Sequence, residues 1–423
     1  MKRTEEKQGT LRWDKLDNTA HVFPVIAGNE MTNVYRISVV LKEEVQQDLL
    51  QQALDIVLPK FEIFHVRLRI FWYYFEENVK RAPRVHEEET YPCRYIVQNK
   101  NRSYLFRVTY YKKRINLEVF HVLTDGMGGI NFLRELTYQY LRLAHPKLRD
   151  ALCSETSLNT EDSFIKNYRK SSQKIYKTQK AYLLKGEKFK EPEFGVIHGY
   201  LNIPQLKSVC KKMGASINEY LVSVFIWSIY TEYMHGMPEK RPVRVAVPVN
   251  LRPFFNSVTT KNFFAMVSAE FEAKKETYTF EEVLKIVCES LRSQINKEHL
   301  EDIFSYNVSN EKILIARAVP LVLKKLAIRS VYTSAALANT STITNIGNIS
   351  VREEYEPYIE GFHAYLAMSK GQNLKGTICS YKDTLVFTFS FILKDTSVQK
   401  AFFRKLASDG LDVSIESNGV YYE

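Results

Sequence analysis

Paired cysteines and long apolar runs are both missing from this 423-residue sequence. Its five cysteines lie far apart, at Cys93, Cys153, Cys210, Cys288 and Cys379. Because no two of them have the close spacing of metal ligands or of a disulfide framework, we expect neither a zinc site nor disulfides. No apolar run approaches the roughly 20 residues of a membrane helix, and the N-terminal stretch lacks the apolar core of a signal peptide. We therefore expect a cytoplasmic protein with no transmembrane segment and no metal.

A concentrated charge of one sign is also missing. The chain has 59 Lys and Arg against 48 Asp and Glu, a formal net charge of +11. This balance is compatible with nucleic acid, an anionic membrane surface or a small polyanionic ligand as partner. Nucleic-acid readers usually concentrate their basic residues on one element, whereas here they are spread along the chain. A nucleic-acid binder is therefore the least favoured class of function.

Aromatic and apolar residues, by contrast, are plentiful. The chain contains 26 Tyr and 25 Phe, and 45% of its residues are hydrophobic. This composition is ordinary for a soluble globular protein, and the chain is long enough for two hydrophobic cores. We therefore expect two domains or one two-lobed body, with large aromatic cores and apolar channels.

The first half of the chain predicts strands followed by a long helix. Residues 32–42 alternate as a strand, and a helical spacing of apolar residues follows. A hairpin pattern at 103–123 leads into a second helical pattern that begins near 128 and ends at about 144. The chain has three glycines close together, Gly126, Gly128 and Gly129. The two patterns predict that they lie between the end of a strand and the start of a helix.

The second half repeats this alternation after a polar stretch. Residues 151–193 are polar and rich in lysine, which predicts a crossover linker. Further on, Ser216 with Glu219 and Thr279 with Glu282 have the spacing of capping boxes, which predicts two helix starts. We expect an α/β fold with two similar lobes, each a mixed sheet with helices. The lobes are residues 1–150 and 194–423.

The stretch EVFHVLTDGMGGINFL, at positions 118–133, carries the strongest chemical signal. A histidine at the end of a buried strand can act as a general base, because its ordinary pKa of about 6.5 lets it take and return a proton near neutral pH. Asp125 can orient a neighbouring group through a salt bridge or cap the following helix. The glycines can let a substrate arm pass close to the backbone.

The residues by themselves leave a second interpretation open. A single strand histidine is commonly a satisfied core residue, and Asp-Gly before a helix is often only a turn with an N-cap. Two metal ligands on a helix would have the same four-residue spacing. The sequence offers no third ligand, and His121 and Asp125 are expected on different elements, which argues against a metal.

Several stretches together resemble the chloramphenicol acetyltransferase-like acyltransferase superfamily. HVLTDG at 121–126 resembles its HxxxDG signature, between a strand and a helix in the first of two lobes. GASINEYLVSVFIWSIY, VPVNLRPFF and TITNIGNISV look like a helix, a PVNLR segment and an SN-x-G strand of the superfamily, closest to the bacterial alcohol acetyltransferase and condensation-domain branch. The resemblance covers residues from about 30 to 410 and implies an active-site tunnel between the lobes.

The resemblance also implies roles for the motif residues. His121 would remove a proton from an acceptor hydroxyl or amine, which then attacks an acyl thioester directly, with no covalent acyl-enzyme. Asp125 would be structural and point toward an arginine, for which Arg67 is our candidate and Arg69 the less favoured one. Gly126 would keep the backbone close to the base.

Weaker assignments concern the second lobe. Thr342, Thr344 and Asn345 are candidates for holding the tetrahedral oxyanion, because preset donors stabilise developing charge. Asn250 and Arg252 are candidates for bracing the site or meeting a phosphate. The last group, which we do not favour, would contact the nucleotide of coenzyme A and consists of Lys207, Lys211 and Lys212.

Two departures from the superfamily pattern stand out. Where many members have two histidines in tandem, the first position here is Phe120, although the catalytic second histidine is retained. The late DFGWG element of the plant branch is absent. The leading hypothesis is an acyltransferase that uses acyl-CoA and an alcohol or amine acceptor. The alternatives are a free-standing condensation-like domain with a carrier-protein thioester, and a noncatalytic binding module of the same fold.

Overall fold

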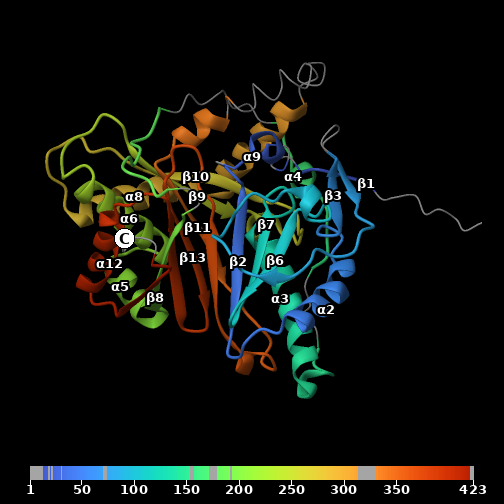
Figure 1. Ribbon diagram of the computed structural model, residues 1–423. Coiled ribbons are helices and arrows are strands. Elements are labelled where there is room, and N and C mark those ends of the chain that lie inside the picture. The colour runs from blue at the N-terminus through green and yellow to red at the C-terminus, as the bar shows by residue number, and fades with distance from the viewer. Residues whose placement is uncertain are drawn as a thin grey trace, which may run out of the picture.

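Two large β-sheets lie side by side at the centre of the molecule, with helices on their outer sides (Figure 1). The structure is a computed structural model. It describes residues 13–17, 20, 22–29, 31–69, 74–152, 157–170, 179–190, 193–312, 330 and 332–419. Cys153 and parts of the predicted linker 151–193 fall outside these residues.

The larger sheet belongs to the second half of the chain and is mixed. Its strands, in spatial order, are β10 (Phe264–Phe271), β9 (Val243–Asn250), β11 (Ser341–Asn348), β13 (Leu374–Tyr381), β14 (Thr384–Phe391), β8 (Gly195–Asn202) and β15 (Val413–Ser417). Strand β11 runs parallel to both of its neighbours, while the other pairs are antiparallel. The strands that form the middle of this sheet are almost fully buried, as their apolar sequences predict.

The second sheet contains strands from both halves. Its order is β12 (Ile359–Leu366), β2 (Val34–Leu41), β7 (Arg114–Phe120), β6 (Phe106–Tyr111) and β5 (His86–Glu87). Strand β12 pairs antiparallel with β2, more than 300 positions earlier in the chain. The sequence division into lobes 1–150 and 194–423 assigned this strand to the second lobe, and the structure corrects that assignment. Local pattern predicts a strand but carries no information about which sheet edge it joins.

A small third sheet completes the first half. It consists of β1 (Trp13–Lys15), β4 (Tyr74–Glu77) and β3 (Val66–Arg69), all paired antiparallel. The α-helices within the described residues are α1 (Phe23–Ile26), α2 (Gln47–Val57), α3 (Gly126–Ala144), α4 (Ser163–Lys166), α5 (Ile203–Lys212), α6 (Ile217–Glu232), α7 (Arg252–Phe255), α8 (Phe280–Gln294), α9 (Lys297–Lys312) and α12 (Ser397–Ser408). Figure 1 shows α5, α6, α8 and α12 together beside the larger sheet and α2 and α3 beside the other one.

The helix starts follow local capping chemistry. Both predicted capping boxes are present: the side chains of Ser216 and Thr279 accept from the third backbone N–H, and Glu219 and Glu282 return a bond to the cap residue. Asp125 caps α3, which begins at Gly126, two residues earlier than the apolar pattern predicted. Each cap satisfies backbone donors that the first helical turn leaves without partners.

Two large hydrophobic cores within the described residues support the halves. In the first core, aromatic rings of α3 pack against rings from other segments of the first half. For example, Phe64, just before β3, stacks on Phe132 of α3 with centroids 4.1 Å apart. In the second, Phe387 of β14 packs on Phe402 of α12 at 4.5 Å. The abundant aromatic residues therefore fill cores, as their number predicted.

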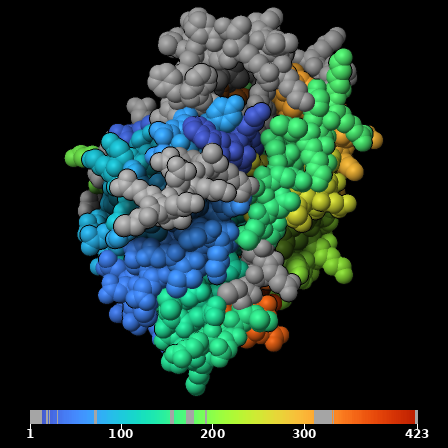
Figure 2. All heavy atoms as spheres, turned by 90° about the vertical axis from the view of Figure 1, so that its right-hand side faces the viewer, coloured from blue at the N-terminus to red at the C-terminus, as the bar shows by residue number. Residues whose placement is uncertain are grey.

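Residues 157–170, which follow α3 in the chain, lie along the boundary between the halves, and Figure 2 shows them in green between blue and yellow regions. The Asn159 carbonyl accepts from the Thr260 N–H at 2.7 Å, and the Glu161 carbonyl accepts from the Thr259 hydroxyl at 2.6 Å. The chain that connects the halves is thus fastened to the loop just before β10.

Candidate active site

A cavity of about 470 Å³ lies where the halves meet. Val34 and Tyr35 of β2 and the motif after β7 form one wall, and the ends of β9, β11 and β13 form the other. The predicted residues that line it are His121, Asp125, Gly126, Asn250, Arg252, Thr342, Thr344 and Asn345. Residues that are distant in sequence therefore line one cavity, which is the arrangement expected for a ligand site.

Asp125 is held by a bidentate ion pair that the sequence did not assign. Arg252 Nη1 lies 2.8 Å from Asp125 Oδ2, and Arg252 Nη2 lies 3.1 Å from Oδ1. The same carboxylate accepts from the backbone N–H groups of Met127, Gly128 and Phe263. Asp125 thus ties the start of α3 to the loop before β10 and to α7.

The prediction that Arg67 pairs with Asp125 is wrong. Arg67 faces Glu76 across the antiparallel β3–β4 pair, with Nε 2.5 Å from Oε2, and Arg69 contacts the same oxygen at 2.7 Å. Direct opposition in a sheet register brings such side chains together. The true partner, Arg252, lies 127 positions after Asp125, and the sequence carries no local signal for that distance.

Arg252 uses all five of its side-chain donors on protein acceptors. Besides Asp125, it donates to the carbonyls of Thr259 (2.8 Å) and Lys261 (2.7 Å) and to Asn250 Oδ1 (3.2 Å). A guanidinium has five N–H groups and no acceptor. Arg252 therefore has no donor left for a phosphate, and of the two predicted roles for Asn250 and Arg252, bracing the site is the one that the geometry fits.

His121 follows β7 directly, and a neighbouring amide orients its ring. The Asn262 Nδ2 group donates to the His121 backbone carbonyl (3.2 Å) and to Asp17 Oδ2 (2.9 Å). Because a carbonyl can only accept, the amide orientation is fixed, and Oδ1 of Asn262 is the atom 3.0 Å from His121 Nδ1. Nδ1 must carry the proton, so that Nε2 has a free lone pair.

The sequence did not single out Asn262 or Asp17. Asn262 lies 141 positions after the histidine, and both side chains are almost fully buried. Burial raises the pKa of the Asp17 carboxyl to about 7. A buried polar residue in a loop beside a strand has many structural uses, so that sequence alone gives no reason to link it to His121.

Aromatic rings enclose the imidazole. Phe23 stacks on it with centroids 4.8 Å apart, and the rings of Tyr35 and Phe264 lie at 5.1 and 5.6 Å. Burial lowers the pKa of His121, and the charge of Asp125 opposes this only partly. The histidine is therefore neutral at pH 7, the form in which Nε2 can accept a proton.

The glycines of the motif occupy their positions for different physical reasons. A Cβ on Gly128 would collide with Thr124 Oγ1 and lie 2.6 Å from the Thr260 carbonyl, and one on Gly129 would lie 2.7 Å from the Tyr35 hydroxyl. These two positions are required by packing within the protein, which corrects the expectation that they make room for a substrate arm. Gly126 does line the cavity.

The oxyanion candidates lie on β11, at a β-bulge. The register with β13 shifts between Asn345 and Gly347, and a bulge breaks the alternation of side chains, which allows the neighbours Thr344, Asn345 and Ile346 all to line the cavity. Asn345 Oδ1 accepts from the Gly347 N–H at 2.8 Å, so that its Nδ2 group remains as donor. The Thr342 hydroxyl already donates to Gln372. Thr342 is therefore a poorer candidate than its neighbours.

The remaining predicted lysines lie elsewhere. Lys207, Lys211 and Lys212 are exposed on α5 and outside the lining of the cavity. Their assignment as coenzyme A contacts stays a prediction.

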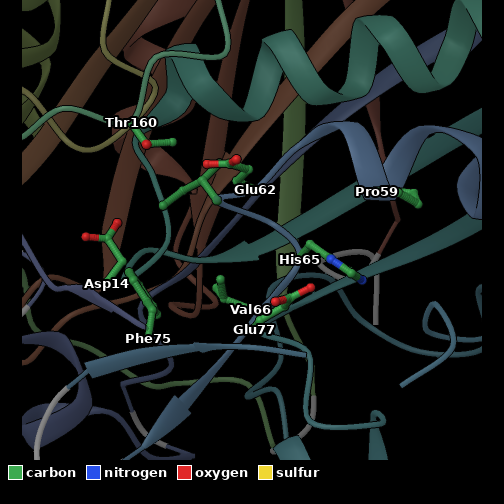
Figure 3. A pocket seen from close by; sticks show the side chains of 9 residues that line it. Asp14, Pro59, Glu62, His65, Val66, Phe75, Glu77 and Thr160 are labelled. Carbon is green, nitrogen blue, oxygen red and sulfur yellow. The ribbon is translucent and has the colours of Figure 1, made fainter. Parts of the chain in front are cut away.

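A second cavity, of about 330 Å³, lies in the first half beside β3 and β4 (Figure 3). Asp14, Glu62, His65 and Glu77 line it. The Asp14 carboxylate is paired with Lys261 at 2.6 Å. This cavity is separate from His121 and contains none of the predicted site residues among its described lining.

Known proteins resemble this chain in structure but not detectably in sequence. No family model matches it, and no curated protein matches it. The structure of Fusarium sporotrichioides TRI101 complexed with coenzyme A and T-2 has a TM-score of 0.66 at 11% identity, over 95% of this chain and 99% of that one. TRI3 trichothecene 15-O-acetyltransferase from the same fungus gives 0.61 at 10% identity, over 96% and 97%.

A condensation domain matches as well. The first condensation domain of the calcium-dependent antibiotic synthetase, in complex with a substrate analogue, has a TM-score of 0.59 at 12% identity, over 95% of this chain and 96% of that one. The chain shares their fold. The predicted chloramphenicol acetyltransferase-like architecture of two lobes with mixed sheets is thereby confirmed.

The described residues contain neither a membrane-spanning helix nor a cluster of metal ligands. No described helix has the length and apolar character needed to cross a membrane. Within the same residues, no three His, Cys, Asp or Glu side chains are grouped to hold a metal ion.

Proposed function

We propose that the protein is an acyltransferase that moves an acyl group from an acyl-CoA thioester to an alcohol or amine acceptor. The observation that carries the proposal is the state of His121. Its Nδ1–H is directed at Asn262, its lowered pKa keeps it neutral at pH 7, and it lines a cavity formed by both halves. A neutral imidazole with a fixed tautomer at the wall of a cavity is suited to general-base catalysis.

In the proposed reaction, Nε2 of His121 takes the proton of the acceptor hydroxyl or amine as its oxygen or nitrogen attacks the thioester carbonyl. The bond to the acceptor forms, and the carbonyl oxygen becomes an oxyanion. Thr344 and the Nδ2 group of Asn345 are the proposed donors to this oxyanion, since donors fixed before the reaction stabilise developing charge. When the tetrahedral intermediate collapses, the C–S bond breaks and the imidazolium returns its proton to the thiolate. No covalent acyl-enzyme is needed.

Asp125 and Arg252 act through the backbone in this scheme. Their ion pair fixes the start of α3 and the loop that carries Asn262. The pair is thus a positioning element, because Asn262 in turn sets the tautomer of His121.

A carrier-protein thioester is the second candidate donor. The observation in its favour is the fold match to a condensation domain over 95% of the chain. Both donors present a thioester on a flexible arm, so that the same cavity and the same histidine serve either one. The two donors differ in the part that binds outside the cavity, which is a nucleotide for acyl-CoA and a protein for the carrier.

The first test is binding and transfer with purified protein. Calorimetric titration with acetyl-CoA, a long-chain acyl-CoA and free coenzyme A measures binding of the donor. Release of free thiol in the presence of a panel of alcohols and amines measures acyl transfer. Saturable acyl-CoA binding with thiol release supports the proposal. Absence of binding, together with transfer from an acyl carrier protein, supports the second donor.

The role of His121 is tested by His121→Ala. We expect turnover to fall by roughly 10² to 10⁴, the usual contribution of a general base, with thioester binding largely unchanged. His86→Ala, at an exposed histidine, is the matched control. Equal turnover in wild type and His121→Ala rejects the assignment, and a full biological effect of that variant indicates a noncatalytic binding module.

A further inference from the structure

A buried lysine lies in the same cavity and has no assigned task. Lys375 is on β13, lines the cavity, and has an exposed fraction of only 7%. Its Nζ donates to Ser369 Oγ at 2.6 Å. Within the described residues no carboxylate forms an ion pair with it, although an ammonium group has three N–H donors and is rarely buried without an anion.

The charges around the cavity are unbalanced when Lys375 is protonated. Asp125 and Arg252 neutralise each other through their bidentate pair, and His121 is neutral at pH 7. The other titratable groups near the lysine, Cys93 and Tyr332, are a thiol and a phenol whose pKa values are raised, so that both are neutral as well. Among the described lining residues, Lys375 thus supplies one positive charge without a partner.

The protein tolerates this cation at a cost. Burial lowers the pKa of Lys375 to about 7, because the charged form loses its hydration and finds only a hydroxyl. A methionine or leucine would fill the position without that cost. A lysine here is explained if an anion enters the cavity during function.

The rest of the cavity wall is largely apolar. Apolar side chains reach it from β10, from the end of β12 and the segment that follows it, and from the bulge of β11. They include Phe264, Met266, Leu366, Met368 and Ile346. A ligand that matches the whole cavity therefore has an apolar body and one anionic end, since sites of this kind place few polar groups to fix orientation.

We propose that Lys375 binds a carboxylate of the substrate, carried either by the acyl group or by the acceptor, while the apolar body fills the cavity toward His121. The inference rests on the proposed function, because that function puts both substrates into this cavity. It goes beyond it by naming a substrate class, a carboxylic acid with an apolar body.

The chemistry predicts a proton signature. A carboxylate beside Nζ favours the ammonium form, so that binding above pH 7 must draw a proton from solution. A lysine that instead stabilised the reaction oxyanion would act on charged and neutral substrates alike. The comparison of matched ligands separates the two roles.

The experiment is calorimetric titration of the full chain with two matched ligand pairs. The acyl arm compares glutaryl-CoA with pentanoyl-CoA, and the acceptor arm compares 10-hydroxydecanoate with 1,10-decanediol. Wild type, Lys375→Met and the control Lys370→Met, an exposed lysine that precedes β13, are titrated at pH 8.5 in two buffers with different ionisation enthalpies. The buffer dependence gives the number of protons taken up.

We expect wild type and Lys370→Met to prefer the carboxylate ligand by roughly 10- to 100-fold in one arm, the usual worth of a charge-assisted hydrogen bond, with uptake of close to one proton. Lys375→Met should lose both the preference and the uptake. The arm that shows the effect identifies the acyl group or the acceptor as the source of the carboxylate. Three outcomes overturn the inference: no preference in either arm, a preference that survives in Lys375→Met, or an equal loss for charged and neutral ligands.

Failure of the proposed function and failure of the Lys375 inference give different results. If acyl transfer is never detected but 10-hydroxydecanoate binds with the Lys375-dependent signature, anion recognition stands and the acyltransferase assignment falls. If transfer depends on His121 and no carboxylate preference exists, only the present inference falls.

Discussion

Replacing Lys375 with methionine should stabilise the protein, and the gain should depend on pH. Burial lowers the pKa of this lysine from 10.5 to about 7, which corresponds to roughly 5 kcal/mol at about 1.4 kcal/mol per pKa unit. The unfolded chain therefore binds more protons than the folded one between about pH 7 and 10.5, so that stability rises with pH in this window. The free-energy cost of burying the charged lysine is complete below pH 7, and it vanishes as the pH rises past the pKa of 10.5 in the unfolded chain.

The assay is urea denaturation of wild type and Lys375→Met at pH 7 and pH 9. Applying linkage to these two pKa values, the stability advantage of the variant should shrink by roughly 2 kcal/mol between the two pH values. Lys370→Met, at an exposed position, controls for removal of a lysine as such and should show no such change.

Lys375→Met differs from wild type only at Lys375. The difference between their free energies of unfolding therefore cancels the contributions of every other titrating group. An advantage that is equal at pH 7 and pH 9, or a variant less stable than wild type at pH 7, refutes the reasoning. Either result would mean that the ammonium is better solvated or better paired than its contact with Ser369 indicates.

Three further predictions concern the support of the site. Arg252→Met should lower the free energy of unfolding by about 3 to 5 kcal/mol, because it leaves a buried carboxylate uncompensated, and adding Asp125→Asn should recover part of that loss in urea denaturation; strictly additive losses would contradict a coupled pair. Gly128→Ala should destabilise by about 1 to 3 kcal/mol through overpacking, despite the better helix propensity of alanine, whereas Gly126→Ala, whose Cβ has no neighbour closer than 3.8 Å, should be neutral or stabilising in a thermal melt. Asn262→Ala should reduce kcat by roughly fivefold, the worth of one hydrogen bond of about 1 kcal/mol, and move the acidic limb of the pH profile to lower pH, since this bond raises the pKa of the imidazole; an unmoved limb would show that the amide does not orient the base.

Local sequence determined several of the helix starts. The capping boxes at Ser216 and Thr279 join residues three positions apart, so that the pattern of a few side chains suffices to predict them. The cap at Asp125 is equally local. The motif resemblance then placed most candidate residues on one cavity, because a fold that is shared also fixes where its strand ends meet.

Only the tertiary structure decided which distant residues touch. Arg252 rather than Arg67 pairs with Asp125, Asn262 sets the tautomer of the histidine, and β12 joins the sheet of the other half. These contacts span more than 100 positions, and a polar side chain in a loop or at a strand start looks the same in sequence whether it meets water or a buried partner. Lys375 is the sharpest case: within an apolar strand it gives no sign of its surroundings, and burial in an apolar cavity with one hydroxyl partner sets its charge.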